Sequence, residues 1–181
     1  MNFLFFIFYF LFLIILQTII IPDTFFFGYC FDLVVIPIVF LSLNSTRYSV
    51  VFSIILIGCI MDSISGVLFS YNIFSYLWIY IIVTLARQIV VQQSFVFILL
   101  ISLFSVLIQD FLMLFINFVK HGKEFWQFEF SFFTKYLFVH LIWGLMFIPF
   151  GIWFTRICKE QWFFVIQNFT TNMAKKYREQ I

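Results

Sequence analysis

Charge is scarce in this chain of 181 residues: Asp, Glu, Lys and Arg together make up 10% of it, whereas hydrophobic residues make up 65%. Soluble domains carry about 25% charged residues, so this composition excludes a soluble protein. The net charge of +2 is too small to indicate a nucleic-acid-binding protein. The chain is therefore expected to be a polytopic membrane protein.

Small residues are scarce as well. Alanine occurs only at Ala86 and Ala174, and there are 6 glycines. Because small residues let transmembrane helices approach closely, the few that remain are candidates for helix contacts. The cysteines, Cys30, Cys59 and Cys158, have no paired spacing, so neither a disulfide framework nor a metal site is predicted, and no cofactor is expected.

Long hydrophobic runs fill most of the chain, and a transmembrane helix needs about 20 apolar residues. Alternating segments of the kind that form closed barrels are absent. We therefore predict an all-α fold with six transmembrane helices in residues 1–155, followed by a tail at 156–181. The predicted spans are 3–21, 25–43, 48–65, a fourth from the turn near Gly66 to Arg87, 94–119 and 136–154.

The distribution of Lys and Arg predicts the orientation, because cytoplasmic loops carry an excess of these residues. With the N-terminus inside, seven basic residues lie on the cytoplasmic side and three on the outer side. We therefore expect both termini in the cytoplasm of a multi-pass protein. The inner set is Arg47, Arg87, Arg156, Lys159, Lys175, Lys176 and Arg178, and the outer set is Lys120, Lys123 and Lys135.

Two segments lie outside the predicted spans. Residues 121–134 are rich in Phe and are expected to lie on the outer surface with their aromatic side chains in the interface; docking of a protein there is an alternative. The tail at 156–181 begins with apolar residues and then becomes basic at Lys175 and Lys176. It is expected to form an amphipathic helix on the anionic inner leaflet.

Four ionisable residues from four predicted helices share the outer half of the bundle: Asp32, Asp62, Asp110 and His140. A charge in hydrocarbon costs from about 3 kcal/mol upward, so these groups must face the bundle interior, a cavity or a partner. Three interpretations stay open. The groups hold neighbouring helices together, they form a partner-docking surface, or they line a small-ligand cavity.

The second and third spans carry the most patterned residues. Gly58, Asp62 and Gly66 recur every four residues and so follow one stripe of a helix, where the glycines permit a close helix approach beside the carboxyl group. Pro37 removes a backbone hydrogen bond and is expected to kink the second span.

These residues resemble two motifs of the MreD family of rod shape-determining proteins. The segment FDLVVIP at 31–37 resembles the family's D-L-x-x-x-P opening of the second span, and GCIMDSISG at 58–66 resembles its G-x-x-x-D-x-x-S-G stretch. The resemblance in motifs covers about residues 31–85, while the rest of the chain matches in hydropathy. The matching positions are Asp32, Pro37, Gly58, Asp62 and Gly66.

The resemblance implies a non-enzymatic scaffold of the bacterial elongation complex in the inner membrane. It implies MreC, which has a single span, as the direct partner, and MreB, RodA and a class B penicillin-binding protein as indirect ones. It also implies a fold similar to the substrate-binding subunits of energy-coupling-factor transporters. On this hypothesis the MreC helix packs beside spans two and three, where Asp32 and Asp62 fix the geometry.

Two other classes of function fit the sequence less well. A vitamin-transporter subunit is the alternative, but such subunits typically carry an Ala-x-x-x-Ala face on their first span, and residues 3–21 contain neither Ala nor Gly. An intramembrane enzyme is not favoured. The sequence around Asp32 and Asp62 lacks the contexts typical of aspartyl proteases, and two distant histidines do not indicate a zinc site.

Overall fold

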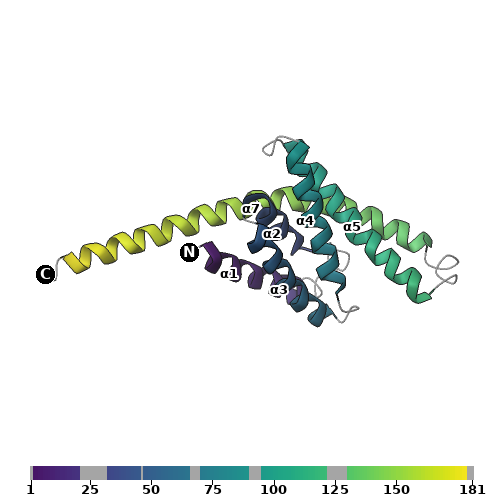
Figure 1. Cartoon of the computed structure of the whole chain (residues 1–181), viewed down its shortest axis with the longest axis horizontal. Coiled ribbons are helices and arrows are strands. Elements are labelled where there is room, and N and C mark those ends of the chain that lie inside the picture. The colour runs from purple at the N-terminus through teal and green to yellow at the C-terminus, as the bar shows by residue number, and fades with distance from the viewer. Residues whose placement is uncertain are drawn as a thin grey trace.

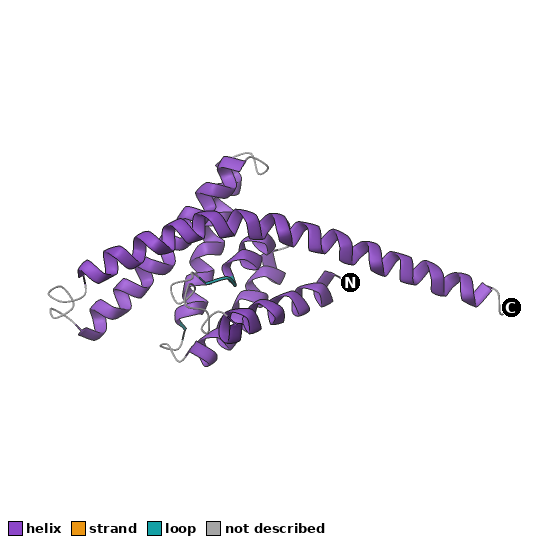
Figure 2. Cartoon of the chain, turned by 180° about the vertical axis from the view of Figure 1, so that it is seen from behind, coloured by secondary structure: helices purple, strands orange, loops and turns teal. Residues whose placement is uncertain are grey.

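The computed structural model describes residues 2–20, 32–45, 47–65, 70–89, 95–121 and 130–178, and these are helical throughout apart from short turns (Figures 1 and 2). No strand occurs in these ranges, which confirms the all-α prediction. The elements are α1 (Asn2–Ile15), the π-helix η1 (Leu16–Ile20), α2 (Val35–Asn44), α3 (Arg47–Ser65), α4 (Tyr71–Ile89), α5 (Phe95–His121) and α7 (Phe130–Arg178).

The short helix α2 forms the centre of the bundle. Every side chain from Val35 to Ser42 is buried, and α2 contacts α3, α4 and α7. A helix that is apolar all round is stable only where neighbours cover it on every side. Helix α4 in turn contacts α5, which packs along α7.

Helix α1 reaches this centre through large side chains. The Phe6 ring lies 6.1 Å from that of Phe40 in α2, centroid to centroid, and the Tyr9 and Thr155 hydroxyls are 2.7 Å apart. Because α1 contains no glycine or alanine, its bulky residues hold its backbone away from its neighbours.

Among the described residues, three helices are long and apolar enough to cross a membrane. The apolar stretches are Tyr48–Ser65 of α3, Phe95–Val119 of α5 and Leu137–Asn168 of α7. Large apolar side chains such as Phe52, Phe111 and Met146 are exposed on these helices, and exposed apolar surface of this extent marks contact with lipid or protein. These observations support a membrane protein.

The predicted glycine contact in the third span is confirmed at Gly58. A Cβ atom built there would lie 2.6 Å from Cγ1 and 2.9 Å from Cα of Ile73. Only a residue without a side chain lets α3 approach the α4 backbone so closely. Gly151 plays a related part in α7, where a Cβ would lie 2.5 Å from Cδ1 of Ile36 in α2. Gly66 lies outside the described residues.

The second span differs from its prediction. The described helix begins at Val35, so Asp32 precedes it instead of lying within it, and residues 25–31 fall outside the described ranges. The predicted kink at Pro37 is wrong. Pro37 lies in the first turn, where the Ile36 N–H already bonds the Leu33 carbonyl at 3.1 Å. A proline in a first turn breaks no helix, because the backbone N–H groups there lack intrahelical partners.

The sixth span is longer than predicted, because α7 runs without a break from Phe130 to Arg178 (Figure 1). It joins the predicted span at 136–154 to most of the predicted tail at 156–181. It also includes 130–134 of the aromatic segment, whereas residues 122–129 lie outside the described ranges. The helix therefore continues through the boundary that was expected after residue 155.

We predict that Gly58→Ala lowers the free energy of unfolding by about 1–3 kcal/mol, the usual cost of overpacking, as measured by denaturation in detergent. Ile73→Ala does not relieve this cost, because the clash involves the backbone of Ile73. Gly151→Ala is the matched control: its clash is with the Ile36 side chain, so Ile36→Ala should remove the added cost. Equal rescue at both sites would contradict the assignment.

Candidate functional site

Asp62, near the end of α3, holds the beginning of α4. Its two carboxylate oxygens accept hydrogen bonds from the Ser70 and Asn72 N–H groups, each at 2.9 Å. The first N–H groups of a helix lack intrahelical partners, and the helix dipole favours negative charge beside them. The buried Asp62 is thus a helix cap supplied by the neighbouring helix.

The same contact fixes the turn between the two helices. Ser70 has a φ of 84°, a left-handed conformation that is unfavourable for a residue with a side chain. The bond from its N–H to Asp62 holds it there, and its carbonyl accepts the first bond of α4, from the Phe74 N–H at 2.9 Å. Gly58 lies one turn before Asp62 along α3 and permits the close approach of α3 to α4. This approach brings Asp62 within hydrogen-bonding distance of the start of α4.

Asp32 is the meeting point of three helices. Its Oδ1 accepts a bond from the Val34 N–H at 3.0 Å, at the start of α2. Its Oδ2 accepts bonds from the Tyr76 hydroxyl of α4 and from the Gln109 amide of α5, the latter at 3.3 Å. Beside it, the Gln17 side chain of η1 accepts a bond from the Leu33 N–H at 3.1 Å. One carboxylate therefore ties α2, α4 and α5 together.

Asp110 and His140 join α5 to α7. His140 Nδ1 lies 3.0 Å from Asp110 Oδ1, and both residues are buried. Asp110 directly follows Gln109, whose carbonyl also accepts a bond from the Tyr71 hydroxyl of α4 at 3.1 Å. The contacts of Asp32 and of Asp110 thus form one continuous layer, here called the polar layer, with Asp62 at the start of α4 beside it.

The four predicted groups lie in the polar layer or, in the case of Asp62, beside it, and their contacts favour the interpretation that they hold helices together. Asp32 and Asp62 each bond to groups of the chain itself, not to each other. No group of three or more His, Cys, Asp or Glu residues that suits a metal ion occurs in the part of the chain described. Asp110 Oδ2 is buried without a hydrogen-bond partner among these residues.

The neutral members of the polar layer were missed by the sequence reasoning, which searched for charges. They are Gln17, Tyr71, Tyr76 and Gln109. A signal was present, because Gln109 directly precedes Asp110 in the sequence. Polar residues this scarce in apolar helices are as informative as the acids they satisfy.

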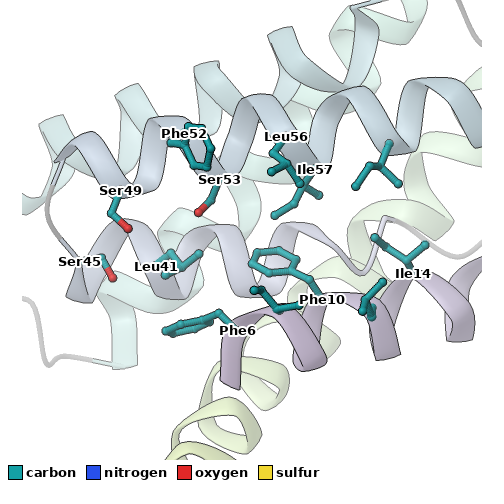
Figure 3. Close-up of a pocket in the computed structure, with 13 residues that line it drawn as sticks. Phe6, Phe10, Ile14, Leu41, Ser45, Ser49, Phe52, Ser53, Leu56 and Ile57 are labelled. Atoms are coloured by element: carbon teal, nitrogen blue, oxygen red, sulfur yellow. The ribbon is translucent and has the colours of Figure 1, made fainter. Parts of the chain in front are cut away.

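A second feature of the bundle is a groove on its surface. An apolar groove of about 500 Å³ runs between α1 and α3, with Leu41 of α2 at its floor. Phe6, Phe10 and Ile14 face it from α1, and from α3 the Ser49 and Ser53 side chains point into it (Figure 3). The groove exists because the bulky residues of α1 keep that helix away from α3.

Comparisons of the chain with protein-family models, with curated proteins and with solved structures find no match.

We predict that Asp62→Ala lowers the free energy of unfolding by about 1–3 kcal/mol, because it leaves two backbone donors without acceptors. Amide hydrogen exchange at Ser70 and Asn72 should accelerate. Asp62→Asn keeps one acceptor oxygen, so its free energy of unfolding should lie between those of the wild type and Asp62→Ala. The control is Ser63→Ala, which removes an exposed hydroxyl bonded only to the Cys59 carbonyl. Unchanged exchange at the start of α4 in Asp62→Ala would refute the capping role.

A double-mutant cycle tests the contact between α5 and α7. His140→Leu strands a buried carboxylate, and breaking a buried pair in this way costs about 3–5 kcal/mol. Asp110→Leu together with His140→Leu leaves no stranded charge and should be less destabilised than His140→Leu alone. Thermal unfolding in detergent measures the stability of Asp110→Leu, of His140→Leu and of the double variant. A double variant that loses the sum of the two single losses would mean that the residues act independently.

Proposed function

We propose that this chain is a non-enzymatic scaffold of the MreD type in the bacterial inner membrane. On this proposal its helices cross the membrane six times, both termini are cytoplasmic, and its direct partner is MreC. MreB, RodA and a class B penicillin-binding protein would then be indirect partners in cell-wall synthesis and cell shape.

The observation that carries the proposal is the joint role of Gly58 and Asp62. These are two fixed positions of the G-x-x-x-D-x-x-S-G stretch that the chain resembles. Gly58 permits the approach of α3 to α4, and Asp62 bonds the start of α4. A motif whose residues set helix geometry suits a scaffold, since a catalytic motif would aim its side chains at a substrate.

The position of the basic residues supports the proposed orientation. Arg87, in the last turn of α4, donates to the Ser42 carbonyl of α2 at 2.7 Å. Lys159 of α7 lies over the Phe40 ring, and Trp162 of α7 lies beside Phe5, near the beginning of α1. The predicted inner residues thus lie at the same end of the bundle as the start of α1, in agreement with an excess of positive charge on the cytoplasmic side.

The groove supports a single transmembrane helix as the bound partner. Apolar side chains line it, while Ser49 and Ser53, four residues apart, give α3 a small-x-x-x-small face. Such a face lets two helix backbones approach closely in a membrane. A modified form of the earlier hypothesis follows: the MreC helix lies between α1 and α3, and Asp32 and Asp62 act indirectly by holding α2, α3 and α4 in place.

We predict that Ser53→Leu lowers the amount of MreC that co-purifies in mild detergent at least about five-fold, because overpacking a fitted contact costs about 1–3 kcal/mol. Ser49→Leu should act in the same direction. Ser63→Leu is the matched control, since Ser63 is an exposed serine of the same helix outside the groove.

Wild-type amounts of MreC with a folded Ser53→Leu protein would exclude the groove as the site. Absence of MreC from the wild-type preparation would argue against the scaffold itself. A vitamin bound tightly to the purified protein, detected by native mass spectrometry, would favour the transporter subunit instead.

A further inference from the structure

A hollow of about 790 Å³ lies at the inner end of the bundle, where α1, α2 and α7 meet. Phe5 of α1 and Phe40 and Asn44 of α2 line one side of it, and α7 supplies the other side from Arg156 onward. The residues that line this hollow belong neither to the polar layer nor to the α1–α3 groove.

Two cations face this hollow. Arg156 and Lys159 both line it, and Lys159 Nζ lies 5.6 Å from the centroid of the Phe40 ring. Glu160 lines it as well, but among the described residues neither Arg156 nor Lys159 forms an ion pair with it. The cations are therefore available to an anion from outside the chain.

Trp162 supplies an unused donor at the same place. Its Nε1 is buried and has no hydrogen-bond partner among the described residues, while its ring packs against those of Phe5 and Phe8, with centroids 6.0 and 6.3 Å away. A buried donor without an acceptor loses its hydrogen bond to water and gains none in return, which is unfavourable. An oxygen atom of a ligand in the hollow would remove this cost.

The surroundings select an amphiphilic anion. Phe163 and Phe164 also line the hollow and are exposed, so charged and apolar groups lie side by side. Lys, Arg and Trp together at the cytoplasmic end of a transmembrane bundle are at the depth of lipid headgroups. Anionic lipids gather in that leaflet and attract basic residues.

We propose that this hollow binds the headgroup of an anionic phospholipid of the inner leaflet. Arg156 and Lys159 contact its phosphate, the Trp162 Nε1–H donates to one of its oxygens, and the acyl chains lie along Phe163 and Phe164. The site requires that the chain lies in a membrane with this end on the cytoplasmic side. It does not require MreC, so its failure and that of the scaffold proposal are separate results.

The test is native mass spectrometry of the full chain, extracted from vesicles with equal amounts of phosphatidylglycerol and phosphatidylcholine. The wild-type protein should retain phosphatidylglycerol preferentially. Arg156→Gln and Lys159→Gln should each lower that retention about five-fold, the effect of one basic residue near an anionic surface. Glu160→Gln is the control in the same hollow: it removes a negative charge, so retention should stay the same or rise.

Trp162→Phe separates a headgroup contact from general attraction to charge. It keeps the ring contacts and removes only the buried donor, so it should lower phosphatidylglycerol retention without lowering stability in lipid-free detergent. Added inorganic phosphate should not displace the lipid. Equal retention of the two lipids by the wild type, equal losses in Lys159→Gln and Glu160→Gln, or displacement by phosphate would each overturn the proposal.

Discussion

Burial of carboxylates in an apolar bundle is the constraint on which this structure depends. A carboxylate away from water must have its oxygens bonded or be costly to the fold. Here Asp62 bonds two N–H groups of α4, and Asp32 bonds groups from α2, α4 and α5. Because each acid binds several partners on other elements, satisfying the acids also fixes how the helices are arranged.

The regions of the bundle therefore differ in how many of their polar groups remain available to a ligand. In the polar layer, the polar groups bond to one another across α2, α4, α5 and α7, and few of their atoms, such as Asp110 Oδ2, are without a partner among the described residues. Near the start of α1, Arg156, Lys159 and Trp162 face a hollow, and the buried Trp162 donor there is unused. The groove between α1 and α3 offers shape and apolar surface. Binding in this chain is accordingly expected away from its buried acids.

Pro37 and Gly58 show how far local rules extend. The prediction for Gly58 succeeded because a residue without a side chain lets another helix approach closely, whichever helix lies opposite. The proline rule failed because its effect depends on position: inside a helix Pro37 would remove a bond, but in the first turn of α2 there is none to remove. The start of α2 is set by Asp32 and by its contacts with α4 and α5, which sequence patterns do not reveal.

The sequence by itself determined that the chain is helical and apolar, which few residues carry charge, and that those charges need shelter, since composition and hydrophobic run length govern transfer into lipid. It also singled out Asp32, Asp62, Asp110 and His140, because ionisable residues are scarce in so apolar a chain and need partners there. Only the tertiary structure decided which neutral residues satisfy each acid, and where α1 stands away from α3. Those outcomes depend on the rotation and approach of helices distant in sequence, and packing between side chains sets both.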